Sequence, residues 1–242
     1  MIIVVTGANG GIGSKIVSHL GQANKILALV RTKTAGNQIK NLENKNITPL
    51  VTNISSLRSV KKTFAHIKKI DVLINCAAIL TPVGKFLDND LDSWRQNITT
   101  NLLGTVYCCQ YALPKLLKSR QGKIINFSGG GAANGRPYHS AYASAKAAVV
   151  RFSETVAMEY PQIDVNAIAP GPHKTKLWDK ETFDTAPKQW GNIEKLLKFI
   201  DFLISKKSDG ISGKFIHYLD NWPEFTPNRI KGNLYTLRRV EK

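Results

Sequence analysis

The sequence predicts a doubly wound α/β fold, in which a parallel sheet of seven strands carries helices on both faces. Seven short runs rich in Val, Ile and Leu recur along the chain, and helical patterns separate most of them. Strands that are buried on both faces of a parallel sheet have such continuous apolar runs. The alternation of strands with helices is typical of parallel sheets assembled from β-α-β units.

The predicted strands are, in chain order, 2–6, 26–30, 47–51, 71–75, 123–127, 163–168 and 214–218. The predicted helices are 12–21, 56–67, 91–118, 139–160 and 193–205. With 242 residues, 43% of them hydrophobic, the chain can bury one sizeable core, so we expect a single domain over residues 1–242. Segment 172–192 is irregular and follows a strand end, where such sheets bind ligands, which predicts a substrate lid. The tail 219–242 has no pattern from which we predict a fold.

The net charge of +17 comes from lysines scattered along the chain and not from one basic run. A solvated surface explains them, and the alternative is a field that attracts anionic ligands. We expect no nucleic-acid partner, because no motif supports one, and no membrane span, because no stretch approaches about 20 apolar residues. The three cysteines lack metal-ligand spacing, which predicts no metal site and favours a reducing, cytoplasmic location.

A glycine-rich turn joins the first predicted strand to the first helix, in the order Thr6-Gly7-Ala8-Asn9-Gly10-Gly11-Ile12-Gly13. Glycines there allow a tight turn and a close approach of backbone to a pyrophosphate, which the helix N-terminus then binds. The turn therefore predicts a dinucleotide site. Its spacing fits two patterns, Gly7-Gly11-Gly13 and Gly7-Gly10-Gly13. The residues expected to contact the cofactor are Gly7, Asn9, Gly10, Gly11, Ile12 and Gly13.

Basic residues follow the second predicted strand. A dinucleotide site usually places an acid about 20 residues after the turn, to hold ribose hydroxyls. Arg31 and Lys33 stand there instead. A guanidinium binds a 2′-phosphate well, whereas a carboxylate repels it. The sequence therefore favours NADP(H) over NAD(H), and the alternative is two solvated basic side chains.

Tyr142 and Lys146 lie four residues apart in the predicted helix 139–160, so both occupy one helix face. A free phenol has a pKa near ~10, too high for efficient proton transfer at neutral pH. A neighbouring ammonium favours the phenolate and lowers that pKa. The pair therefore predicts an acid/base that moves the proton accompanying a hydride transfer.

Taken together, these motifs resemble the compact single-domain branch of the short-chain dehydrogenase/reductase family over about residues 1–218. The resemblance rests on the glycine-rich turn, Asn75-Cys76-Ala77-Ala78, Asn101, Tyr142 to Lys146, and Pro170-Gly171. It implies a Rossmann fold. The segments Phe127 to Ala132 and Tyr235 to Arg239 also look like a bacterial subset associated with surface-polysaccharide synthesis.

The resemblance also implies roles for single residues. Tyr142 would be the acid/base, Lys146 would lower its pKa and bind the nicotinamide ribose, and Asn101 would hold a proton-relay water at a helix kink. Other positions would contact the cofactor: Asn53 and Ile54 near the adenine, Asn75 and Ala77 in a turn beside it, and Pro170, Gly171 and Thr175 along the nicotinamide.

The carbonyl-polarising serine of the family is the exception. The family places it thirteen residues before the tyrosine, and Gly129 occupies that position here. We predict that Ser128, one residue earlier, takes the role through a rearranged glycine loop. The alternative is that the role is lost. Ser140 is predicted to cap the start of the Tyr142 helix.

The sequence thus predicts an NADP(H)-dependent oxidoreductase that transfers hydride between nicotinamide and a carbonyl or alcohol. We expect a polar or anionic small-molecule substrate, such as a sugar or a sugar nucleotide. Two alternatives stay open, a nucleotide-sugar epimerase or dehydratase and a non-catalytic dinucleotide-sensing regulator. Apolar residues of the helices 91–118 and 139–160 predict a homodimer or homotetramer.

Overall fold

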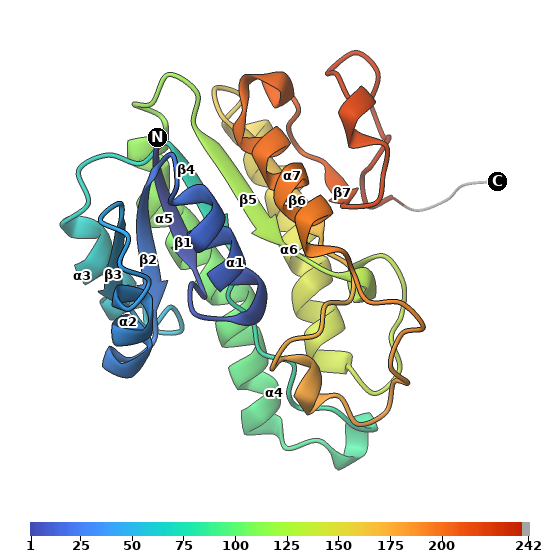
Figure 1. The fold of residues 1–242 in the computed structure, drawn as a ribbon. Helices are drawn as coiled ribbons and strands as arrows, with labels where there is room; N and C mark the ends of the chain where they lie inside the picture. Colours follow the sequence, from blue (N-terminus) through green and yellow to red (C-terminus); the bar gives the residue numbers. More distant parts are fainter. Residues whose placement is uncertain (239–242) are drawn as a thin grey trace.

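The structure is a computed structural model that describes residues 1–238; Arg239, the last residue of the tail motif, and residues 240–242 lie outside the described part. Seven parallel strands form one sheet in the order β3-β2-β1-β4-β5-β6-β7, which confirms the predicted fold class (Figure 1). The strand bounds are Ile2–Thr6, Lys25–Val30, Ile47–Val51, Val72–Asn75, Lys123–Phe127, Asp164–Ala169 and Phe215–His217 for β1 to β7. Each predicted strand end lies within one residue of the observed one.

The strand order predicts a ligand site at the carboxyl ends of β1 and β4. The chain runs outward from β1 through β2 to β3 and then returns to β4 on the other side of β1. In such sheets the connections after two neighbouring strands diverge to opposite sides, and ligands bind in the gap. Thr6 and Asn75, the last residues of β1 and β4, are register partners at this point. The glycine-rich turn therefore begins at the carboxyl ends of the strands, where a ligand is expected.

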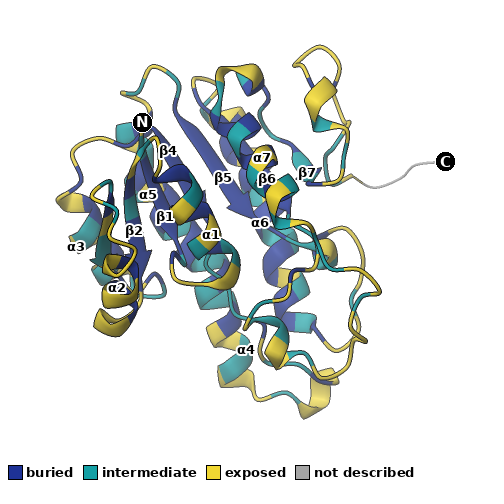
Figure 2. Cartoon of the chain, in the orientation of Figure 1, coloured by how far each residue is buried: buried dark blue, intermediate teal, exposed yellow. Residues whose placement is uncertain are grey.

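Helices cover both faces of the sheet. Their bounds are Gly11–Leu20, Lys33–Lys40, Leu57–Ala65, Leu91–Ile98, Gly104–Leu116, Ser140–Glu159 and Ile193–Ile204 for α1 to α7. One apolar core lies under α1, α2 and α7, and a second lies under α3, α5 and α6. Successive residues of β1 point alternately to the two cores, as a pleated strand requires: Ile3 and Val5 to the first, Val4 to the second. Figure 2 shows the buried strands between these helical layers.

Two helical regions differ from the prediction. Helix α2 was not predicted, because its sequence is mostly polar; Thr32 caps it by accepting a hydrogen bond from the Ala35 backbone N–H at 3.2 Å. The predicted helix 91–118 is divided into α4 and α5 by a π-helical turn at Thr99–Leu103. Such turns are rare and occur often at functional sites. This one contains Asn101.

The tail packs along the β7 edge of the sheet. The Phe215 backbone N–H donates to the Tyr235 carbonyl at 2.7 Å, and Lys214 Nζ donates to the Gly232 and Leu234 carbonyls at 2.9 and 3.0 Å. At the opposite edge, β3 carries Pro49 in its middle. Within residues 1–238, no helix has both the length and the apolar character needed to cross a membrane.

Candidate active site

Close backbone packing explains the glycines after β1. Gly7 has a φ of +64°, and a Cβ there would lie 2.7 Å from Ala77 Cα. A Cβ at Gly13 would overlap the Gly7 carbonyl, and one at Gly11 would overlap the Thr175 methyl group. Gly10 is less tightly packed, with a contact of 3.1 Å. The closest approaches therefore match the first of the two predicted spacings, Gly7-Gly11-Gly13.

The residues at this edge fit a dinucleotide. Helix α1 begins at Gly11, and no side chain caps the N–H groups of its first turn, so they can bind a pyrophosphate. Asn9 and Ile12 lie in the same turn. Arg31 is exposed directly after β2, where the ribose of an adenosine is held in such folds. Asn53 is also exposed, and its side-chain oxygen accepts from the Ser55 N–H at 3.1 Å.

Ala77 and Asn75, both predicted to lie beside the cofactor, have different surroundings in the structure. Ala77 lies against Gly7, and its N–H donates to Thr6 Oγ1 at 3.2 Å, so its backbone belongs to the glycine-rich turn. The Asn75 side chain instead points into the core, where its Nδ2 donates to Asn126 Oδ1 at 2.9 Å. Asn75 therefore ties β4 to β5.

Asn101 is fully buried and fastens the loop that follows β4. Its Oδ1 accepts from the Ile79 N–H at 2.9 Å, and its Nδ2 donates to the Ile79 carbonyl at 2.8 Å and to Asn97 Oδ1 at 2.6 Å. The π-helical turn directs this side chain inward. Its role in proton relay stays a prediction.

Tyr142 and Lys146 are both buried on one face of α6, at the end of β5. Lys146 Nζ donates to the Phe127 carbonyl at 2.7 Å and lies 5.5 Å from the centre of the Tyr142 ring. Burial raises the pKa of Tyr142 to about 12, although the Arg136 charge acts in the opposite direction. Burial also lowers the pKa of Lys146 to about 8. The expected lowering of the phenol pKa is therefore outweighed here by desolvation of both groups.

The turn after β5 brings Gly129 to the tyrosine. A Cβ at Gly129 would lie 3.4 Å from Tyr142 Oη. The Ser128 hydroxyl instead donates to the Lys146 carbonyl at 2.9 Å and is buried, so it joins β5 to α6. The polarising role predicted for Ser128 remains untested. The cap predicted for Ser140 is wrong: His139 is the N-cap residue, and the Ser140 hydroxyl accepts from Trp94 Nε1 at 3.1 Å.

A family model described as short chain dehydrogenase matches residues 1–186. The chain belongs to the short-chain dehydrogenase family. It is therefore an NAD(P)-dependent oxidoreductase that acts on a small molecule, as the sequence predicted.

Several relatives and solved structures are similar to this short-chain dehydrogenase. The 3-oxoacyl-(acyl-carrier-protein) reductase of Buchnera aphidicola is 32% identical over 89% of this chain and 94% of its own length. The Aquifex aeolicus reductase of the same name is 28% identical over 89% and 94%. The ligand-free aldohexose dehydrogenase of Thermoplasma acidophilum has a TM-score of 0.79 at 24% identity, over 89% and 91% of the two chains. A Shigella flexneri short chain dehydrogenase complexed with NADP has a TM-score of 0.81 at 21% identity, over 90% and 96%.

In this short-chain dehydrogenase, the start of segment 172–192 contacts the glycine-rich turn through Thr175. Thr175 reaches Gly11, and Gly171, with a φ of +71°, packs so closely that a Cβ would lie 2.7 Å from Tyr218 Cε1. His173 Nε2 bonds to the Pro170 carbonyl at 2.9 Å, which holds the start of the segment. Of the positions predicted along the nicotinamide, Thr175 therefore contacts the glycine-rich turn, whereas Gly171 packs on Tyr218 and Pro170 binds His173. Their contact with a cofactor stays a prediction.

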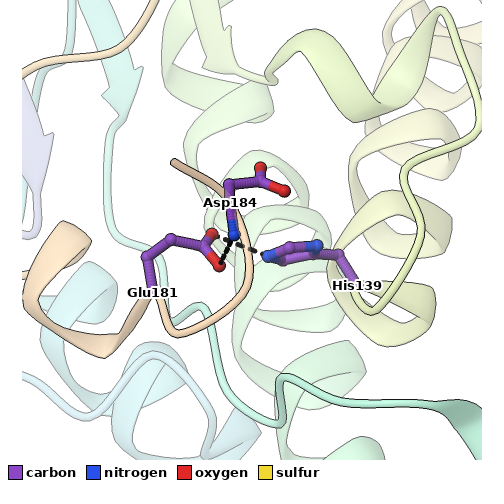
Figure 3. Close-up of side chains that lie close together, drawn as sticks. All are labelled: His139, Glu181 and Asp184. Atoms are coloured by element: carbon purple, nitrogen blue, oxygen red, sulfur yellow. Dashed lines mark hydrogen bonds and ion pairs between the residues drawn. The ribbon is translucent and has the colours of Figure 1, made fainter. Parts of the chain in front are cut away.

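The sequence did not predict a cluster that joins this segment to α6. Glu181, from the segment, pairs with Arg136 and His139, from the loop before α6, and Asp184 pairs with Arg136. Figure 3 shows Glu181 directed at His139, with Asp184 beside them. The only signal in the sequence is the presence of acidic residues in segment 172–192. Acidic residues in an irregular segment do not indicate with which residues they pair, and here the partners lie more than 40 residues away in the chain.

Proposed function

We propose that the chain is an NADP(H)-dependent reductase of a polar carbonyl compound, in which Tyr142 exchanges a proton with the carbonyl oxygen. One observation carries the proposal: the Tyr142 hydroxyl lies at the end of β5 beside Gly129, with Lys146 on the same helix face. When bound, the nicotinamide supplies or accepts the hydride. The first turn of α1 lies at the same carboxyl-terminal side of the sheet, and its N–H groups would bind the pyrophosphate of the cofactor.

The preference for NADP(H) rests on the residues after β2. Arg31 and Lys33 are exposed on either side of Thr32, the cap of α2. No acid stands between the end of β2 and α2 to repel a 2′-phosphate. A guanidinium at this point favours the phosphorylated ribose.

The substrate class that we propose is polar or anionic. The net charge of +17 raises the local concentration of anions, and Lys174, Lys176 and Lys180 are exposed on segment 172–192. The names of similar proteins suggest two carbonyl classes, oxidised sugars and 3-oxoacyl thioesters. We place sugars and sugar nucleotides first, because the segment is mostly polar and exposed.

The test is a panel of carbonyl compounds assayed for NADPH consumption at low and high salt. The panel would contain oxidised sugar nucleotides, phosphorylated carbonyls, 3-oxoacyl thioesters and neutral apolar ketones. We expect the anionic compounds to react fastest, with a rate that salt diminishes. Faster turnover of apolar ketones without salt dependence would overturn the substrate class.

A Tyr142→Phe variant tests the chemistry. It keeps the ring and removes the proton, so we expect NADPH binding to persist while turnover falls by about 10²–10⁴. Turnover within a few-fold of wild type would exclude Tyr142 as the acid/base. NADPH binding without turnover of any carbonyl by the wild type would favour the dinucleotide-sensing alternative.

A further inference from the structure

Three glycines in succession follow the end of β5, and the first of them lies beside the Tyr142 hydroxyl. A Cβ at Gly129 would lie 3.4 Å from Tyr142 Oη, whereas one at Gly130 would meet nothing within 4 Å. Glycine has more backbone freedom than any other residue, and a run of glycines has no side chain with which to pack. The position of this glycine run, residues 129–131, therefore depends largely on the residues at its two ends.

Both ends of the glycine run are held by contacts with α6. At the first end, the buried Ser128 hydroxyl donates to the Lys146 carbonyl at 2.9 Å. At the second end, Ala132 carries the first side chain after the glycines and is only 6% exposed. Its methyl group belongs to a small apolar cluster with Val150 of α6 and Ala167 of β6. The second anchor of the glycine run is therefore the packing of this cluster.

The C-terminal tail completes the packing of the cluster. The half-buried Leu237 side chain packs against it, together with Ala147 and Phe215. The other members of this group are three alanines, one valine and one phenylalanine, so Leu237 supplies a large share of its apolar volume. Protein interiors are close-packed, and removal of a large side chain leaves a gap into which its neighbours can move. Loss of the Leu237 side chain would therefore loosen the anchor at Ala132.

A buried carboxylate holds Leu237 at this place. Glu154 of α6 is 4% exposed, and its Oε1 accepts from the Leu237 backbone N–H at 2.7 Å. Its Oε2 accepts from Arg238 Nη1 at 3.0 Å and also pairs with Arg151. A buried carboxylate is stable only when such donors satisfy it, and two of the three come from the tail. The helix that carries Tyr142 thus also carries the anchor of the tail.

We propose that Leu237 is a positioning residue of the active site, which holds the glycine run beside Tyr142 by packing on the cluster that contains Ala132. Glu154 acts one step further away, because it holds Leu237. This inference rests on the role proposed above for Tyr142, but the order of the glycine run can be measured without turnover.

The experiment measures amide hydrogen exchange by NMR in the protein without substrate. The N–H groups of Ala132 and Ala133 donate to the Gly129 and Gly130 carbonyls at 3.0 and 3.2 Å, so their exchange reports how often this turn opens. We expect Leu237→Ala to speed exchange at both amides by about tenfold. Leu237→Met keeps the apolar volume and should restore the slow exchange. Unchanged exchange at both amides in Leu237→Ala would overturn the inference.

Two further variants test the specificity of this effect. Leu234→Ala is the matched control, because the Leu234 side chain is 55% exposed on the same tail, and its exchange should equal that of the wild type. Glu154→Ala should speed exchange at the same two amides. Combining it with Leu237→Ala should add nothing, because both changes act through one side chain. Additive effects of the two changes would reject the role of Glu154.

The effect on rate separates positioning from a general loss of stability. We expect Leu237→Ala to lower kcat by about tenfold while KM for NADPH stays unchanged. Gly130→Ala has space for its methyl group and reduces the freedom of the glycine run, so it should recover part of the kcat lost in Leu237→Ala. A kcat that is not recovered and falls in parallel with Tm would reject a role through the glycine run. Faster amide exchange in Leu237→Ala, without carbonyl turnover by the wild type, would support the positioning and reject only the proposed function.

Discussion

A Cβ built on Gly129 would lie 3.4 Å from the Tyr142 hydroxyl oxygen, an ordinary van der Waals contact, so position 129 points toward the tyrosine oxygen. The Gly129 φ is 179°, which is extended backbone that any residue adopts. A side chain would therefore fit at position 129 without backbone strain, and its first atom would lie beside the Tyr142 oxygen. Glycine at position 129 therefore supplies no hydroxyl beside the Tyr142 oxygen, although the extended backbone there would accommodate a serine.

A Gly129→Ser variant should gain activity. The new hydroxyl could donate to a carbonyl oxygen held by Tyr142, and one preorganised donor contributes roughly 10²–10³ in rate. We expect kcat to rise by about tenfold or more with the best ketone of the panel. Gly130→Ser is the control, because a Cβ at Gly130 meets open space and its hydroxyl would not face the tyrosine. Equal kcat in both variants would contradict this expectation.

Ser128→Ala should cost stability more than rate. The hydroxyl is buried and donates to the Lys146 carbonyl, so its removal takes away a buried hydrogen bond between the turn after β5 and α6. We expect a loss of about 1 kcal/mol in the free energy of unfolding by urea denaturation. We expect kcat to change by only a few-fold. A hundredfold loss in kcat with unchanged stability would instead support the polarising role predicted from the sequence.

Arg31→Ala should weaken NADPH binding while leaving NADH binding unchanged. A hydrogen bond to a charged group contributes about 1.5–3 kcal/mol, which corresponds to at least a tenfold change in Kd. Calorimetric titration of both cofactors measures the difference. Lys45→Ala, which removes an exposed charge before β3, is the control. Equal affinity of the wild type for NADPH and NADH would refute the preference.

The buried Lys146 predicts a pH-dependent stability. Its pKa is lowered from 10.5 to about 8 by burial, so the unfolded chain binds one more proton between these values. Stability from this group therefore rises with pH through that window, and the burial penalty is largest below about 8. Relative to Lys146→Met, the wild type should gain Tm as the pH is raised from 8 to 10. The exposed Lys118→Met control should show no such trend, and a flat difference for Lys146→Met would contradict the lowered pKa.

Self-association should use the part of α5 and α6 that stays outside the core. Val149 and Val150, two apolar residues of α6, are fully buried within the chain and so belong to its own core. Val106, Tyr107, Leu113 and Phe152 are half-buried and remain available. We expect light scattering at micromolar concentration to give at least twice the mass of one chain, and Val106→Glu to reduce it. A monomeric mass for the wild type would reject the predicted dimer or tetramer.

The strands and the glycine-rich turn could be predicted because their signals are local. Apolar runs identify buried strands, and the turn lies directly between a strand and a helix. Helix α2 was missed, since only Ala35, Gly36 and Ile39 of its eight residues are buried and the rest are polar. The apolar pattern alone predicted one helix over 91–118, because it continues almost without interruption through the π-helical turn. Only the family resemblance, which implied a kink at Asn101, indicated an irregularity there.

The site was predicted less completely than the fold. Spacing along one helix places Tyr142 and Lys146 together, and it needs no tertiary information. The direction of the Ser128 hydroxyl depends on the distance between β5 and α6, which no local pattern contains. The pairing of Glu181 with Arg136 and His139 likewise depends on how an irregular segment folds back. Such contacts between distant segments have no periodicity from which they can be inferred.

The two edge strands of the sheet, β3 and β7, influence whether the protein aggregates at high concentration. An exposed edge strand offers unpaired N–H and C=O groups to other chains and so promotes aggregation. At β3, Pro49 removes one of these donors, and at β7 the Tyr235 carbonyl already accepts from the Phe215 N–H. Removal of the tail from residue 219 onward would therefore expose β7 as a template for intermolecular strand pairing. The shortened chain should form oligomers rich in β-structure under conditions in which the full-length protein remains dispersed.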